Sequence, residues 1–129
     1  MPISETYRAM KGIALSEFSD VAIGAQILRL PSGDPMKLRL DIVDGSLLDV
    51  YISLTGRYSY HWERRMTQVE DIYRYDNAPH KRWRSLASFP AHFHDGAESH
   101  VVASDLEEEP VHAIKQVLGF VRKKLSSPG

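Results

Sequence analysis

The sequence contains no cysteine among its 129 residues. Disulfide bonds, thiolate zinc sites, iron–sulfur clusters and a cysteine nucleophile are therefore excluded. The uninterrupted apolar stretches are only a few residues long, whereas a transmembrane helix needs about 20 apolar residues. Residues 1–5 show no basic region followed by an apolar run, so no secretory signal is visible. We therefore expect a cytoplasmic protein without a membrane segment.

The sequence also has no large excess of either charge, because its formal net charge is only −1. The charged residues are nevertheless distributed unevenly along the chain. Residues 57–84 carry seven basic and four acidic side chains, whereas residues 95–109 carry six acidic ones and no Lys or Arg. Nine of the twelve aromatic residues and five of the six histidines lie between residues 51 and 100. A basic, aromatic, His-rich middle favours contact with a polyanion or chemistry on one, although a solvated sheet face has the same composition.

Hydrophobic periodicity predicts one helix near each end of the chain. Residues 4–18 repeat apolar side chains at helical spacing, and Ser4 is the expected N-cap. Near the C-terminus, the sequence 104–107 (Ser-Asp-Leu-Glu) fits a capping box, and an apolar stripe with helical spacing follows it. The acidic residues 107–109 and the basic residues 122–124 would then complement the dipole of this second helix.

Between the two helices, apolar and polar residues alternate with a period of two, which is typical of antiparallel strands. We expect a strand over residues 21–30, a hairpin around Asp44-Gly45 where glycine supplies the positive φ of a tight turn, and strands near 58–63 and 69–75. Residues 81–100 are expected to form a long irregular connection.

These elements predict an α+β fold in one domain over residues 1–129. The expected architecture is an antiparallel β-sheet of about four to five strands, covered by the N-terminal and the C-terminal helix. Such a sheet has one apolar face that the helices bury and one polar face that stays open.

Polar side chains that could carry chemistry gather in the His-rich middle. His92 and His94 would face one way if residues 91–94 are extended, while Phe93 would point into the core and anchor both. The candidate catalytic residues are His80, His92, His94, Asp76 and Arg74, and the candidate substrate-binding residues are His61, Asn77, Tyr60, Trp62 and Arg82.

One interpretation of this set is metal-independent cleavage of RNA. The reaction needs a base for the 2′-hydroxyl, an acid for the leaving oxygen and a cation for the phosphate. Histidines would transfer the protons, Arg74 and Arg82 would hold the phosphate, and Asp76 would orient an imidazole. Aromatic rings such as those of Tyr60 and Trp62 would stack on bases. This interpretation needs no cofactor.

Two other interpretations stay open. The His-x-His pair at 92 and 94 could join Asp76, Asp95 or His80 in a metal site of a hydrolase. Alternatively, a basic aromatic sheet face could bind a nucleic acid or a protein without catalysis. Purely structural roles also exist, since Asp-Asn pairs cap turns, strand arginines form solvated ion pairs and aromatic residues fill cores.

The segments 74–80 (Arg-Tyr-Asp-Asn-Ala-Pro-His) and 89–96 (Phe-Pro-Ala-His-Phe-His-Asp-Gly) resemble the TumE-like family, which comprises toxins of type II toxin–antitoxin pairs. The strand 58–62 (Tyr-Ser-Tyr-His-Trp), the Asp44-Gly45 hairpin and the helix start at Ser104 also fit, so that the resemblance covers roughly residues 20–122. Lys81 departs from the family, which often has a further histidine there.

The resemblance implies growth inhibition that a protein antitoxin encoded beside the chain neutralises. RNA as the target is an extrapolation from the residue inventory and from the habits of small toxins. The exposed edges of a small antiparallel sheet would also suit antitoxin docking or a homodimer.

Overall fold

The computed structural model describes residues 2–64 and 71–127, and within them two α-helices enclose seven strands in sequence. A short 3-10 helix, η1 (Lys81–Trp83), lies between the fifth and sixth strands. The elements are α1 (Ile3–Glu17), β1 (Ala22–Arg29), β2 (Pro35–Ile42), β3 (Leu47–Ile52), β4 (Tyr58–Glu63), β5 (Ile72–Asp76), β6 (His92–Gly96), β7 (Val101–Ala103) and α2 (Pro110–Leu125).

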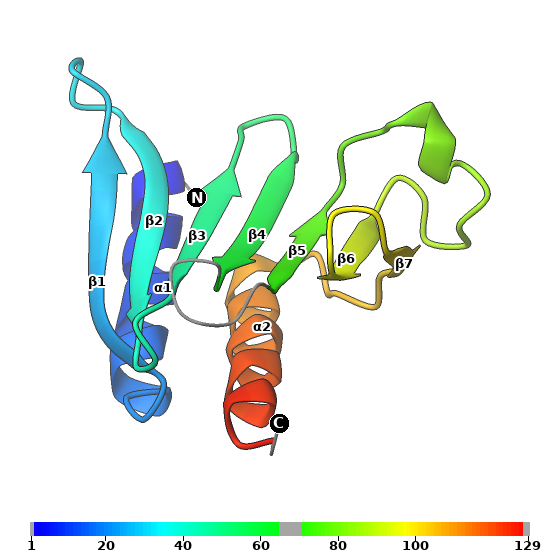
Figure 1. The fold of residues 1–129 in the computed structure, drawn as a ribbon. Coiled ribbons are helices and arrows are strands. Elements are labelled where there is room, and N and C mark those ends of the chain that lie inside the picture. Colours follow the sequence, from blue (N-terminus) through cyan, green and yellow to red (C-terminus); the bar gives the residue numbers. More distant parts are fainter. Residues whose placement is uncertain (1, 65–70, 128–129) are drawn as a thin grey trace.

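The strands form one sheet in the order β1-β2-β3-β4-β5-β6-β7, and every strand pairs antiparallel with its neighbour in the chain (Figure 1). The predicted α+β class with two covering helices is confirmed. The predicted number of four to five strands is wrong, because the described part of the chain has seven. The expected irregular connection over residues 81–100 in fact contains β6, and β7 follows it directly.

Both helices cover the same face of the sheet (Figure 1). Residues from each helix are fully buried against the strands, including Tyr7 and Met10 of α1 and Ile114 and Leu118 of α2. Burying one such side chain contributes about 1.5–3 kcal/mol. The Tyr7 hydroxyl also accepts a hydrogen bond of 2.9 Å from the backbone N–H of Ile52, which ties α1 to the end of β3.

An aromatic cluster fixes the orientation of the later strands. Phe120 of α2 makes edge contacts with Trp62, Tyr73, Tyr75 and Phe93, which all point to the helix side of the sheet. The rings of Tyr75 and Phe93 stack with centroids 4.2 Å apart. The expected inward position of Phe93 is therefore confirmed, and the side chains on either side of it emerge on the opposite face.

The tight turn at Asp44-Gly45 is confirmed, since Gly45 has a φ of 92°. The expected strand over residues 69–75 is present from Ile72 onward, and residues 69–70 lie outside the described part. Among the described residues, no helix combines the length and the apolar character that crossing a membrane requires.

The predicted starts of both helices are corrected by the structure. Helix α1 begins after Pro2, and no side chain caps it, so Ser4 is not the N-cap. Helix α2 begins at Pro110, with Glu109 as the N-cap that accepts a 2.8 Å hydrogen bond from the N–H of His112. Proline is favoured at the first helical position and excluded from a helix interior, and its presence at 110 overrides the capping box at 104–107.

Candidate functional site

The open face of the sheet carries a continuous row of polar side chains. The strand register places Arg39 beside Asp49, Asp49 beside His61, His61 beside Arg74, and Arg74 beside His94. Neighbouring strands lie about 4.8 Å apart, so directly opposed side chains are within reach of one another. The meander therefore gathers on one surface residues that are spread over positions 39–94 of the sequence.

At the β2–β3 end of the row, the charges neutralise one another. The Asp49 carboxylate accepts hydrogen bonds from Arg39 at 2.9 Å and from Lys37 at 2.8 Å. Burial alone would raise the pKa of Asp49, but these two cations together hold it below its usual value. A fully paired group of this kind supplies structure and leaves little charge available to a ligand.

At the β5–β6 end, a cavity of about 370 Å³ opens on the sheet face, and we call it the histidine cleft. Strands β5 and β6, helix η1 and the loop after β6 supply its walls. The lining residues are Arg74, His80, Arg82, Trp83, His94, Glu98 and Ser99. Four of the residues predicted from the sequence are thus brought together: Arg74, His80, Arg82 and His94.

Arg74 makes polar contacts with three side chains in and beside the cleft. Its terminal nitrogens donate to the two carboxylate oxygens of Glu98 at 2.7 and 2.8 Å, and Nη2 also lies 3.1 Å from Nε2 of His94. Its Nε lies 3.3 Å from Asp76 without the geometry of a hydrogen bond. Hydrogen bonding to Arg74 lowers the pKa of Glu98, so this carboxylate stays charged and is a weak base.

His94 is almost completely buried, and its contacts determine its protonation. Nδ1 lies 2.9 Å from the carbonyl oxygen of Glu98, and Nε2 faces the guanidinium of Arg74. A guanidinium has only donors and a carbonyl only accepts, so these partners fit the neutral ring with its proton on Nδ1. Burial lowers the pKa of His94, in agreement with this assignment.

His92 lies beside His94, beneath Trp83, and is 1 % exposed. Its Nδ1 lies 3.0 Å from the carbonyl oxygen of Pro90, which accepts the ring proton. The other nitrogen, Nε2, is buried and has no hydrogen-bond partner among the described residues. Leaving a buried acceptor unpaired costs about 1–3 kcal/mol. The prediction that His92 and His94 share a face is confirmed, but both lie deeper than an exposed catalytic pair would.

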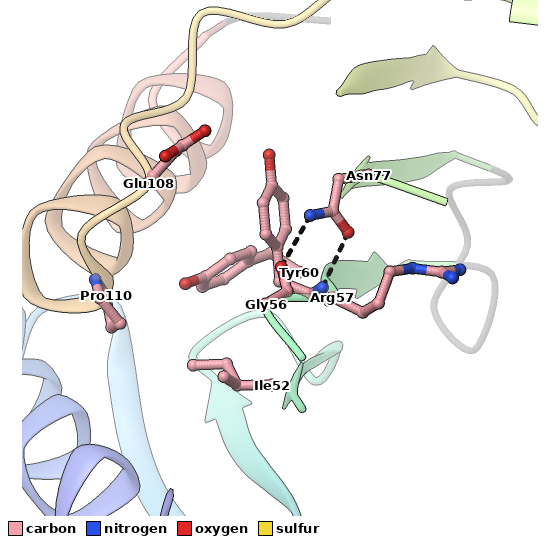
Figure 2. A pocket seen from close by; sticks show the side chains of 8 residues that line it. Ile52, Gly56, Arg57, Tyr60, Asn77, Glu108 and Pro110 are labelled. Carbon is pink, nitrogen blue, oxygen red and sulfur yellow. Dashed lines mark hydrogen bonds between the residues drawn. The ribbon is translucent and has the colours of Figure 1, made fainter. Parts of the chain in front are cut away.

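Asp76 and Asn77 stabilise turns. The Asp76 carboxylate accepts a hydrogen bond of 2.6 Å from the N–H of Ala78, and it approaches Arg74 rather than an imidazole. The Asn77 side chain accepts from the N–H of Tyr58 at 2.9 Å and donates to the carbonyl oxygen of Gly56 at 2.8 Å (Figure 2). Asn77 therefore connects the end of β5 to the β3–β4 turn and does not line the histidine cleft.

The predicted aromatic contacts lie elsewhere. Tyr60 and Trp62 are 2 % and 1 % exposed and face the helices, so that no ring face is open to a base. The indole N–H of Trp62 donates to the hydroxyl of Ser46 at 2.7 Å. His61 is on the open face, with Nε2 3.4 Å from the carboxylate of Glu63, but it lies outside the cleft walls.

Three cleft residues were not found from the sequence: Trp83, Glu98 and Ser99. Trp83 contacts the rings of both His92 and His94, with ring centroids 6.0 and 6.2 Å apart. The adjacent Arg82 places its guanidinium carbon 5.3 Å from the centre of the Trp83 ring. The basic and aromatic composition of residues 81–84 is the only sequence signal for this wall, since the segment has no periodicity. Glu98 and Ser99 have no such signal.

The metal-site hypothesis predicts a cluster of ligands around the His-x-His pair. Within residues 2–64 and 71–127, no three His, Asp or Glu side chains come close enough together to hold a metal ion. His94 already uses both ring nitrogens for Arg74 and Glu98.

Comparison with models of protein families matches residues 16–125 to the family described as Toxin TumE. Neither curated proteins nor solved structures give a match to this chain. The family match includes every strand of the sheet, the histidine cleft and all of α2. The chain therefore belongs to the TumE toxin family.

Proposed function

We propose that this protein is the toxin of a type II toxin–antitoxin pair and that it cleaves RNA in the histidine cleft without a metal ion. The observation that carries the proposal is the composition of one open cavity: two histidines, two arginines and an indole ring line it together. Imidazoles exchange protons near neutral pH, and guanidinium groups bind phosphate oxygens.

The two histidines differ in a way that suits separate roles. His94 is neutral, and its Nε2 is a base that takes the proton of a ribose 2′-hydroxyl once the incoming hydroxyl displaces the Arg74 guanidinium from this nitrogen. The freed oxygen attacks phosphorus, the bond to the 5′-oxygen breaks, and a protonated His80 gives its proton to that oxygen. His80 is exposed, and its ring has no hydrogen-bond partner among the described residues. The products are a 2′,3′-cyclic phosphate and a free 5′-hydroxyl.

The two arginines also differ. Arg74 is neutralised by Glu98 and Asp76, so its first role is to position His94. Arg82 is exposed and makes no ion pair within the described part of the chain. Arg82 is therefore the cation available for a phosphate, and the neighbouring Trp83 ring is the surface on which a base would stack.

A second candidate function is binding without catalysis. It is favoured by the burial of His92 and His94, whose Nδ1 atoms are both held by backbone carbonyls as in a structural histidine. In that case the exposed residues Lys81, Arg82 and Arg84 around Trp83 would bind nucleic acid or protein, and no proton transfer would occur.

Incubation of the purified chain with RNA in the presence of a chelator separates the two functions. Cleavage predicts fragments that end in 2′,3′-cyclic phosphate, and His80→Gln should abolish them while RNA binding on a gel persists. His112→Gln is the matched control, because His112 is an exposed histidine at the start of α2. Intact RNA that only shifts on the gel supports the binding function, and RNA that neither shifts nor breaks contradicts both.

Expression in cells tests the toxin and its partner. The chain expressed alone should arrest growth, and His80→Gln and Arg82→Ala should each relieve the arrest at equal protein levels. Co-expression of a protein encoded in an adjoining reading frame should restore growth to the wild-type chain and form a complex with it. Continued growth on expression of the folded wild-type chain would contradict the toxin assignment.

A further inference from the structure

A second cavity, of about 340 Å³, lies between the β3–β4 turn and the segment that leads into α2 (Figure 2). We call it the tyrosine pocket. It shares no lining residue with the histidine cleft. Its walls are Ile52, Gly56, Arg57, Tyr58, Tyr60, Asn77, Glu108 and Pro110.

Tyr60 has an unused hydroxyl in this pocket. Its side chain is buried, yet the hydroxyl has no hydrogen-bond partner among the described residues. Burial raises the pKa of Tyr60, and it also raises the pKa of Tyr58, so both hydroxyls stay protonated. The two rings lie 5.7 Å apart. The Tyr60 oxygen is not among the buried unpartnered atoms of the described chain, so it opens into the pocket and is accessible to a ligand atom that donates a hydrogen bond.

Glu108 supplies an unpaired negative charge at the same place. The acidic residues 107–109 were expected at the start of the second helix, but α2 begins at Pro110, and of these three residues only Glu109 caps it. Glu107 pairs with His112 at 3.1 Å. Glu108 forms no hydrogen bond or ion pair within the described residues. Figure 2 shows its carboxylate facing the pocket, while the Arg57 side chain points away from it.

An apolar groove continues from the tyrosine pocket. A neighbouring cavity of about 330 Å³ shares Ile52 and Pro110 with it and is also lined by Ile3, Leu54 and Val111. Leu54 is 88 % exposed, the highest value among the exposed large apolar side chains of the described chain. An exposed apolar patch that is rimmed by polar groups, here the Tyr60 hydroxyl and the Glu108 carboxylate, is typical of a surface that binds a peptide.

We propose that this groove binds a segment of the neutralising protein, with a Lys or Arg side chain in the tyrosine pocket and an adjacent aliphatic side chain on Leu54. An ammonium or guanidinium group has only donors, and it would satisfy the tyrosine oxygens and the Glu108 carboxylate together. Tyrosine ring faces also attract cations. The carboxylates of Glu108 and Glu109 would repel RNA phosphates, so a protein segment is the favoured occupant. That the bound protein neutralises this chain rests on the proposed function.

A peptide titration tests the groove without RNA and without cell growth. The isotopically labelled chain is titrated with acetyl-Leu-Lys-Leu-amide and followed by amide NMR shifts, with the Gln and Glu analogues as matched probes. We expect saturable shifts of the Asn77 side-chain amide and of the Gly56 and Tyr58 N–H groups. The Lys peptide should bind about tenfold more tightly than the Gln peptide, and the Glu peptide should bind most weakly.

Substitutions locate the interaction. Glu108→Gln should remove the preference for Lys over Gln, and Tyr60→Phe should weaken Lys-peptide binding severalfold while the ring and the fold are kept. Glu107→Gln is the control, because this neighbouring carboxylate does not line the pocket, and it should leave binding unchanged. Equal affinity for the Lys and Gln peptides, absence of saturable shifts, or an equal effect of Glu107→Gln would each overturn the inference. Growth arrest and RNA cleavage are scored separately, so failure here leaves the proposed function standing.

Discussion

The two faces of strands β4 to β6 carry opposite kinds of side chain on consecutive residues. The helix side holds Trp62, Tyr75 and Phe93 in an aromatic cluster around Phe120. The open side displays Arg74 and His94, each within one residue of those anchors. The aromatic face therefore positions the cleft, because each polar side chain is fixed by the buried ring next to it in the strand.

The largest loss of stability is expected from a substitution on the helix side of the sheet. Phe93→Ala should lower the free energy of unfolding by about 3–5 kcal/mol, because it removes a buried ring that stacks on Tyr75 and contacts Phe120. That loss is a large part of the roughly 5–15 kcal/mol that stabilises a typical domain. Denaturant unfolding measures it. Leu54→Ala is the control, because Leu54 is exposed and should change stability by less than about 0.5 kcal/mol.

On the open face, the second prediction concerns Arg74. Arg74→Met keeps much of the side-chain volume but leaves Glu98 and Asp76 without their shared cation and His94 without its donor. We expect a loss of about 1–3 kcal/mol in the free energy of unfolding, smaller than that of Phe93→Ala. A loss as large as that of Phe93→Ala would contradict the distinction between an anchoring face and a displayed face.

The third prediction is a dependence of stability on pH. Burial lowers the pKa of His94 in the folded chain below its ordinary value of 6.5. The unfolded chain therefore binds more protons between the two values, and stability falls as the pH drops below about 6.5 through this window. The wild-type chain should lose more stability than His94→Gln between pH 7.5 and the lowered pKa, as measured by denaturant midpoints.

Local patterns were sufficient to predict most of the sheet. The Asp44-Gly45 hairpin combines strict alternation with a glycine at positive φ, and both signals lie within a few residues. The strands β6 and β7 were missed because they have only five and three residues and carry no clear alternation. These two segments are extended because they hydrogen-bond to neighbouring strands, and a periodicity search along the sequence does not detect such pairing.

The candidate site was likewise predicted only in part, because residue type can be read from the sequence but contacts with distant strands cannot. Residue types with the right chemistry indicated His80, His94, Arg74 and Arg82, and the cleft contains all four. The burial of His92 could not be predicted, since it depends on the position of Trp83 and on pairing with β5. The start of α2 was misplaced because two valid signals competed, and Pro110 prevailed over the capping box at 104–107.

The smallest expected change in stability concerns two adjacent glutamates, Glu108 and Glu109, in the segment before α2. Glu109 caps the helix through the N–H of His112, so Glu109→Ala should lower the free energy of unfolding by about 1 kcal/mol. Glu108→Ala should leave it unchanged, because Glu108 faces the tyrosine pocket and has no partner in the described chain. Thermal unfolding at neutral pH measures both. Equal losses for the two variants would mean that Glu108 also stabilises the helix, and its charge would then not be free for a partner.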